Sequence, residues 1–150
     1  MEKYNIPESI NTFGVHVKTF PAGIGEAFER LSKELEKGLN RPYYGISWMD
    51  EKGNVIYYAT SAELFPGEAK KYNHETIVIE KGEYYSEAIK DWRSNLACIK
   101  DVFHDMMESG KTDSTKPCIE WYKSNDEMLC LIKAIAEEEK ATKIKQTTRS

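Results

Sequence analysis

Hydrophobic and polar residues follow a regular order along the first half of the chain. Residues 13–20 alternate between apolar and polar side chains, which predicts a half-buried strand. Apolar residues then recur every three or four positions over residues 24–39, as on one face of an amphipathic helix that ends before Pro42. Two further strands are predicted over residues 43–48 and 55–60, joined by a polar hairpin turn.

The second half of the chain repeats this order. After a polar connector over residues 61–73, expected to be a surface loop with at most a short helical turn, residues 75–80 predict a strand. Apolar residues at helical spacing from Ile89 to Met106 predict a helix that ends at Gly110. Residues 117–123 and 127–132 then predict a second hairpin.

These elements predict an α+β fold built from a tandem repeat of two strand-helix-strand-strand modules. We expect a mostly antiparallel sheet, two main helices and a central groove between the modules, which is a natural place for a ligand. Alternating strands and helices are common, so the order can also arise by chance. Residues 1–133 are expected to form the domain. Residues 134–150 lack sustained apolar periodicity and are expected to form a C-terminal tail.

Composition narrows the class of protein. The 150 residues suit one domain with a genuine core, and a net charge of −4 argues against direct DNA binding, which needs a basic surface. No apolar run is long enough to cross a membrane, and the N-terminus lacks the pattern of a signal peptide. The three cysteines are too scattered for a zinc site and are expected to be reduced, so we predict a cytoplasmic protein without metal or cofactor.

Glu120 is the most informative single residue. Aromatic residues make up 11% of the chain, and Glu120 lies among them in the predicted strand Cys118-Ile119-Glu120-Trp121-Tyr122. A carboxylate buried there without a partner is costly, and a cationic ligand held by aromatic faces would supply the partner. The alternative is a glutamate on an edge strand that points to solvent, which strand parity also permits.

The expected walls of the pocket are five aromatic side chains: Trp48, Tyr58, Tyr84, Trp92 and Phe103. Two of these assignments compete with a plain core role, because Trp92 and Phe103 lie on the apolar stripe of the predicted helix. Tyr57 and Tyr58 point to opposite faces of one strand, so only one of them can line a pocket, and Tyr58 is preferred. No nucleophile elbow or phosphate-binding loop is present in the sequence, so no catalytic residue is assigned.

The ordered set of motifs resembles the GyrI-like effector-binding domain, the ligand module of AraC-type multidrug-responsive regulators. The resemblance covers about residues 13–132 and rests on Phe20-Pro21-Ala22-Gly23, Tyr43-Tyr44-Gly45-Ile46-Ser47, Gly82-Glu83-Tyr84 and Cys118-Ile119-Glu120-Trp121-Tyr122. It implies two strand-helix-strand-strand modules that form a groove, with a glutamate at the position of Glu120 that meets cationic, lipophilic drugs or dyes.

The resemblance also sets the functional expectation. Too few residues precede the first predicted strand for a helix-turn-helix, so we expect a stand-alone module that binds cationic amphipathic small molecules for sensing or sequestration, with a protein partner or a homodimer possible. Two alternatives follow from the same resemblance. One is a GyrI-like hydrolase in which Glu120 activates water against reactive small molecules, and the other is a protein that modulates DNA gyrase.

Overall fold

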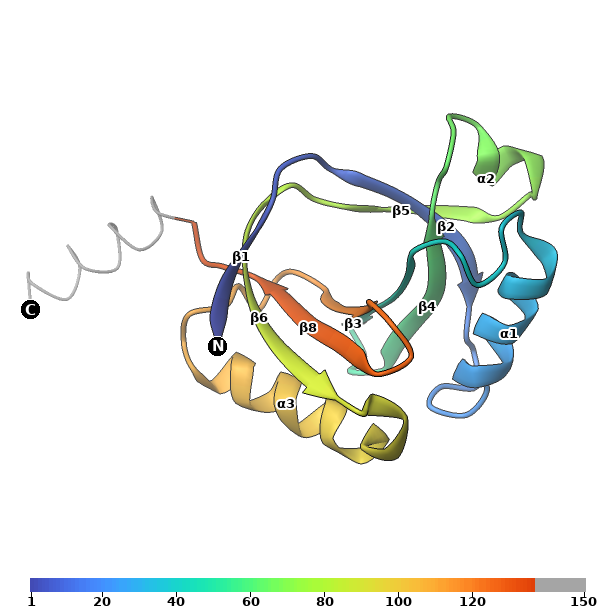
Figure 1. Ribbon diagram of the computed structural model, residues 1–150. Coiled ribbons are helices and arrows are strands. Elements are labelled where there is room, and N and C mark those ends of the chain that lie inside the picture. Colours follow the sequence, from blue (N-terminus) through green and yellow to red (C-terminus); the bar gives the residue numbers. More distant parts are fainter. Residues whose placement is uncertain (137–150) are drawn as a thin grey trace, which may run out of the picture.

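The computed structural model describes residues 1–136 as a single curled sheet with helices on its outer face (Figure 1). All neighbouring strands are antiparallel, in the order β1-β6-β8-β7-β3-β4-β2-β5. The strands are β1 (Glu2–Ile6), β2 (Ile10–His16), β3 (Tyr43–Met49), β4 (Val55–Ala62), β5 (Glu75–Ile79), β6 (Gly82–Lys90), β7 (Cys118–Tyr122) and β8 (Glu127–Lys133). The helices are α1 (Ile24–Glu34), the short α2 (Glu68–Lys71), the 3-10 turn η1 (Trp92–Ser94) and α3 (Leu96–Glu108).

The strand order is symmetric about its centre, because the sheet is built from two modules of the same topology. One module consists of β2, α1, β3 and β4, and the other of β6, α3, β7 and β8. The modules meet where β3 pairs with β7, so a pseudo-two-fold axis passes between these two strands. Each half of the chain also begins with one extra strand that crosses to the other half: β1 pairs with β6, and β5 pairs with β2. The predicted α+β tandem repeat is confirmed, with this exchange of strands as an addition.

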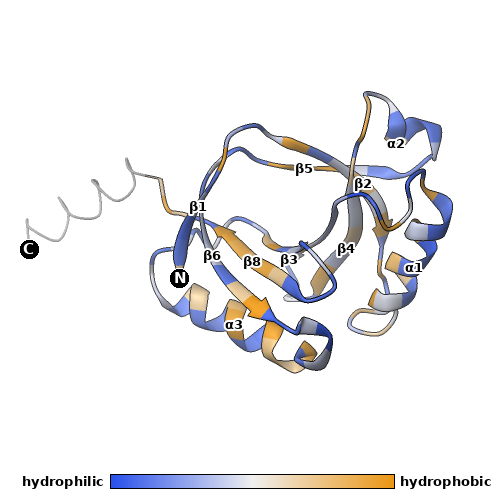
Figure 2. Ribbon diagram, in the orientation of Figure 1, coloured by the Kyte–Doolittle hydropathy of each residue, from blue (hydrophilic) through white to orange (hydrophobic). Residues whose placement is uncertain are grey.

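The two faces of the sheet carry separate hydrophobic clusters. The inner face curls around a cluster from β1, β3, β5, β6, β7 and β8 that includes Ile46, Tyr84 and Leu131. On the outer face, α1 packs over β2 and β4 through Leu31, and α3 packs over β6 and β8 through Met106. Figure 2 shows that β8 is mostly hydrophobic. This composition suits a strand that is covered on both faces. Between the two helices lie β3 and β7, the strands at the pseudo-two-fold axis.

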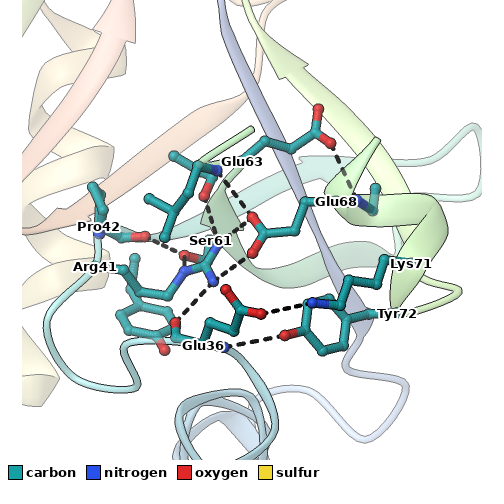
Figure 3. A network of polar contacts seen from close by, with 12 residues as sticks. Glu36, Arg41, Pro42, Ser61, Glu63, Glu68, Lys71 and Tyr72 are labelled. Atoms are coloured by element: carbon teal, nitrogen blue, oxygen red, sulfur yellow. Dashed lines mark hydrogen bonds and ion pairs between the residues drawn. The ribbon is translucent and has the colours of Figure 1, made fainter. Parts of the chain in front are cut away.

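A buried ion pair fixes the connections around α1 and α2 (Figure 3). The Arg41 guanidinium donates 2.6 and 2.9 Å hydrogen bonds to the two carboxylate oxygens of Glu68, and both side chains are fully buried. Arg41 also donates to the Ser61 hydroxyl and to the carbonyls of Glu36 and Ala62. The pair therefore joins the segment after α1, the end of β4 and the start of α2, which leaves α1 in a fixed position over the sheet.

Several predicted boundaries are wrong, and one strand was missed in each half. Residues 82–90 were predicted as a break and the start of a helix, but they form β6, and α3 begins only at Leu96. Ile89 and Trp92 continue the helical spacing by coincidence. In β6 the neighbours Tyr84 and Tyr85 are both buried, one on each face, so the strand has no alternating pattern. Strand β1 was missed because it is a short, mostly polar edge strand.

The remaining elements lie close to their predicted positions. The helix predicted over residues 24–39 ends earlier, at Glu34, and the first predicted strand is shifted to Ile10–His16. The short helical turn expected in the connector is α2. None of the helices in residues 1–136 is long and apolar enough to cross a membrane. The tail expected over residues 134–150 falls mostly outside the described residues; Ala134 still forms a bridge with Thr112.

Candidate functional site

Glu120 lies on the outer face of β7, at the junction of the two modules, where two tyrosines bind it. The hydroxyls of Tyr57 from β4 and Tyr122 from β7 each donate a 2.6 Å hydrogen bond to the carboxylate oxygen Oε1. The other oxygen, Oε2, has no hydrogen-bond partner within residues 1–136. Within the described part of the chain, one oxygen is therefore held by two hydroxyl donors, and the other has none.

Gly45 makes room for this arrangement. It is the residue of β3 directly opposite Glu120 in the register between β3 and β7. A Cβ atom at Gly45 would lie 2.1 Å from the Tyr57 hydroxyl and 2.4 Å from Glu120 Oε1, distances at which atoms overlap. The absence of a side chain at Gly45 is what lets Tyr57 reach across β3 to the carboxylate. One module thus supplies the acid, and the other supplies the space and a hydroxyl donor.

The carboxylate has no compensating positive charge in the described part of the chain. Burial is the largest influence and raises the pKa of Glu120 above its ordinary 4.5, although the two tyrosine hydroxyls act in the opposite direction. Within residues 1–136, no lysine, arginine or histidine forms an ion pair with it. Burial, together with the nearby carboxylate, also raises the pKa of Tyr57 and Tyr122 well above 10, so both hydroxyls remain donors. Among residues 1–136, the carboxylate therefore has hydroxyl donors but no basic partner.

Four aromatic side chains surround the three hydrogen-bonded groups, and we call them the aromatic collar: Phe20, Phe28, Tyr43 and Trp92. The Tyr122 ring contacts two of them, with centroid distances of 5.2 Å to Phe28 on α1 and 4.9 Å to Trp92 in η1. Phe28 also meets Tyr43 edge-on at 6.1 Å, and Phe20 stacks on Tyr57 at 5.2 Å. All four collar residues are half-buried, so their rings keep part of their surface exposed.

Of the six residues predicted to contact a ligand, two come together here. Both contact Tyr122: Glu120 accepts a hydrogen bond from its hydroxyl, and Trp92 packs against its ring. Trp92 is held in place because its indole N–H donates to the Ser124 carbonyl at 3.0 Å. Trp92 was predicted as part of the helix stripe, but η1 lies between β6 and α3 and turns the indole toward β7.

The other four predicted residues lie elsewhere. Trp48 and Tyr58 stack on each other 5.7 Å apart, on the face of the sheet opposite Glu120, and Tyr58 donates to Glu75. Tyr84 is buried in the inner cluster and Phe103 in the cluster beneath α3. It is Tyr57, and not Tyr58, that reaches Glu120.

The sequence contained a signal for some of the residues that were missed. Tyr122 lies two positions after Glu120, so strand parity places both side chains on the same face. Phe28 lies on the apolar stripe of α1, and Phe20 precedes that helix. Tyr57 was weighed against Tyr58 and not chosen. Strand parity places the two side chains on opposite faces of β4, but it does not say which of these faces is shared with Glu120 on β7. That choice depends on the register of three strands.

Comparison with known proteins identifies the fold and leaves the family open. No family model matches the chain, and no curated protein matches its sequence. Solved structures do share its fold. An integron cassette protein of Vibrio cholerae, VCH_CASS2, is 15% identical, with 89% of this chain and 95% of that chain covered and a TM-score of 0.64.

Two further solved structures share the fold. SAV2435, solved bound to tetraphenylphosphonium, is 12% identical with 92% and 95% covered and a TM-score of 0.67. The C-terminal domain of EcmrR is 12% identical with 89% and 96% covered and a TM-score of 0.53. At such low identity the likeness concerns the fold alone, and these neighbours fit the GyrI-like effector-binding fold.

Proposed function

We propose that this protein binds lipophilic organic cations, as a GyrI-like effector-binding module, with Glu120 as the counter-charge. The observation that carries the proposal is the carboxylate itself: Oε1 is held by Tyr57 and Tyr122, Oε2 has no hydrogen-bond partner within residues 1–136, and no basic side chain of that segment pairs with it. Supplying a cation to a desolvated carboxylate removes the cost of its unpaired charge.

The collar determines the kind of cation. Phe28 and Trp92 both pack against Tyr122, and Phe20 stacks on Tyr57, so aromatic rings surround the groups that hold the carboxylate. Such faces attract a delocalised or quaternary cation, by about 0.5–2 kcal/mol for each ring, and bury its apolar substituents. A small hydrated ion such as Na⁺ gains little there. The proposal agrees with the ligand of SAV2435, a protein of the same fold that was solved with tetraphenylphosphonium.

The proposal is tested by thermal unfolding with and without ligand. Tetraphenylphosphonium and, as an uncharged control, triphenylphosphine oxide are added to the wild type and to Glu120→Gln. A ligand at about 100 times its Kd stabilises the native state by roughly 2.7 kcal/mol. For a domain of this size that corresponds to a rise in Tm of roughly 5–11 °C.

We expect the rise with the phosphonium ion in the wild type and a much smaller one in Glu120→Gln, which keeps the shape of the side chain but not its charge. Ser47→Ala, on the outer face of the neighbouring strand β3, is the matched control and should respond like the wild type. Equal shifts in the wild type and Glu120→Gln, or equal shifts with the charged and uncharged compounds, would contradict the proposal.

A further inference from the structure

A second cavity lies on the inner face of the sheet, away from Glu120. Its volume is about 210 Å³. Its lining comes from β1, the β1–β2 connection, the start of β2, β3, β7 and β8, and consists of Tyr4, Ile6, Pro7, Glu8, Ile10, Tyr44, Trp121 and Leu131. Because successive residues of a strand point to opposite faces, β7 presents Glu120 to the outer face and Trp121 to this cavity. The two sites are therefore separated by the sheet itself.

Three aromatic rings form the walls of this cavity. The Trp121 indole meets the Tyr4 ring edge-on at 5.9 Å and stacks on the Tyr44 ring at 6.4 Å. The Tyr4 and Tyr44 hydroxyls have no hydrogen-bond partner within residues 1–136. Several aromatic faces around a small volume attract a quaternary ammonium group, whose methyl groups carry the positive charge.

The charges around the cavity favour a cation as well. Glu8 is exposed on the β1–β2 connection at its edge, and its carboxylate has no ion pair within the described part of the chain. A cation already touches Trp121 from outside the lining: the Lys123 ammonium lies 5.4 Å from the ring centroid, and Glu127 holds it by an ion pair of 3.3 Å. The indole thus accepts a positive charge, and Glu127 pairs with that of Lys123 within the same β7–β8 hairpin.

The size of the cavity limits the ligand. Pockets for drug-sized molecules usually have volumes of about 300–1,000 Å³, so this cavity is too small for a compound such as tetraphenylphosphonium. From these observations we propose that the inner cavity is a second binding site, for a small methylated ammonium compound of the choline type. The quaternary group lies among Tyr4, Tyr44 and Trp121, and Glu8 neutralises its charge.

The indole N–H resonances of the full chain provide the test. The protein has three tryptophans: Trp121 reports on the inner cavity, Trp92 on the collar around Glu120, and the Trp48 indole lies on an exposed stack apart from both. Each resonance in a two-dimensional ¹H–¹⁵N NMR spectrum is assigned with a Trp→Phe variant. Choline is then titrated, with 3,3-dimethylbutan-1-ol as the uncharged molecule of the same shape.

We expect choline to shift the Trp121 resonance to saturation, and the uncharged alcohol to leave it in place. Glu8→Gln should weaken choline binding by roughly three-fold or more, as for the loss of one partly solvated charge. Glu51→Gln, an equally exposed carboxylate in the β3–β4 turn, should not change it. The proposal would be overturned if choline does not shift the Trp121 resonance, or if choline and the uncharged alcohol shift it equally. It would also be overturned if choline shifts the Trp92 resonance and not that of Trp121. Binding of tetraphenylphosphonium at Glu120 is followed separately by the Trp92 resonance, so its failure would be distinguished from a failure of choline binding.

Discussion

Replacing Gly45 with alanine tests whether the geometry around Glu120 depends on an absent side chain. The added Cβ would lie 2.1 Å from the Tyr57 hydroxyl and 2.4 Å from Glu120 Oε1. A relaxed contact needs about 3.5 Å, so one or both groups must move by more than about 1 Å. Tyr57 is only 1% exposed and has no room to withdraw. Such overpacking costs typically about 1–3 kcal/mol.

Urea unfolding measures this cost, and calorimetric titration with tetraphenylphosphonium measures its effect on the site. We expect Gly45→Ala to be less stable than the wild type by about 1–3 kcal/mol and to bind the phosphonium ion more weakly, because Oε1 loses a donor. Gly25→Ala is the matched control: a Cβ there meets nothing within 4 Å, and alanine suits α1 better than glycine. Its stability should be equal to or above that of the wild type.

A second substitution makes the test specific to the hydroxyl. Tyr57→Phe removes the atom nearest to the new Cβ, so Gly45→Ala should cost less in the Tyr57→Phe background than in the wild type. Wild-type stability of Gly45→Ala, or costs that simply add in the double variant, would refute the reasoning that Gly45 is needed for the approach of Tyr57.

Three further predictions follow from the buried charges. Glu68→Gln leaves the Arg41 charge buried and unpaired, so urea unfolding should show a loss of about 3–5 kcal/mol, whereas Glu29→Gln, in an exposed pair, should have little effect. Burial alone would raise the pKa of Glu68, but the hydrogen bonds from Arg41 and a backbone N–H hold it below 4.5. The contribution of Glu68 to stability is therefore complete above pH 4.5 and is lost as the pH falls through the lowered pKa. Acid unfolding of Glu68→Gln and Glu29→Gln should reveal this difference. Because the pKa of Glu120 is raised, the ligand-free wild type should lose stability relative to Glu120→Gln as the pH rises from 4.5 through that raised pKa, as unfolding at a series of pH values would show.

The sequence was sufficient to predict the repeat and to single out Glu120 as a candidate site residue. Two helices with apolar stripes and two hairpins at similar spacing are local patterns, and α1, β3, β4, β7 and β8 lie near where those patterns place them. Glu120 stood out because a carboxylate among aromatic residues on a strand needs a partner, which is an argument about one residue and its neighbours.

What the sequence did not reveal depends on long-range pairing. The exchange of β1 and β5 between the halves and the burial of both faces of β6 are set by the curled sheet. The same holds for the site: Tyr57 reaches Glu120 across Gly45 only because β3 lies between β4 and β7 in one particular register. A shift of register by one residue would bring Tyr58 to that face instead.

Of all these tests, the titration of the Glu120 carboxyl group by ¹³C NMR, with and without saturating tetraphenylphosphonium, bears most directly on its role as the counter-charge. Glu120→Gln assigns the resonance. In the free protein we expect the pKa to lie above the ordinary 4.5, and in the complex we expect it to fall, because a bound cation stabilises the carboxylate. An ordinary pKa in the free protein, or a raised pKa that the phosphonium ion leaves unchanged, would contradict the account.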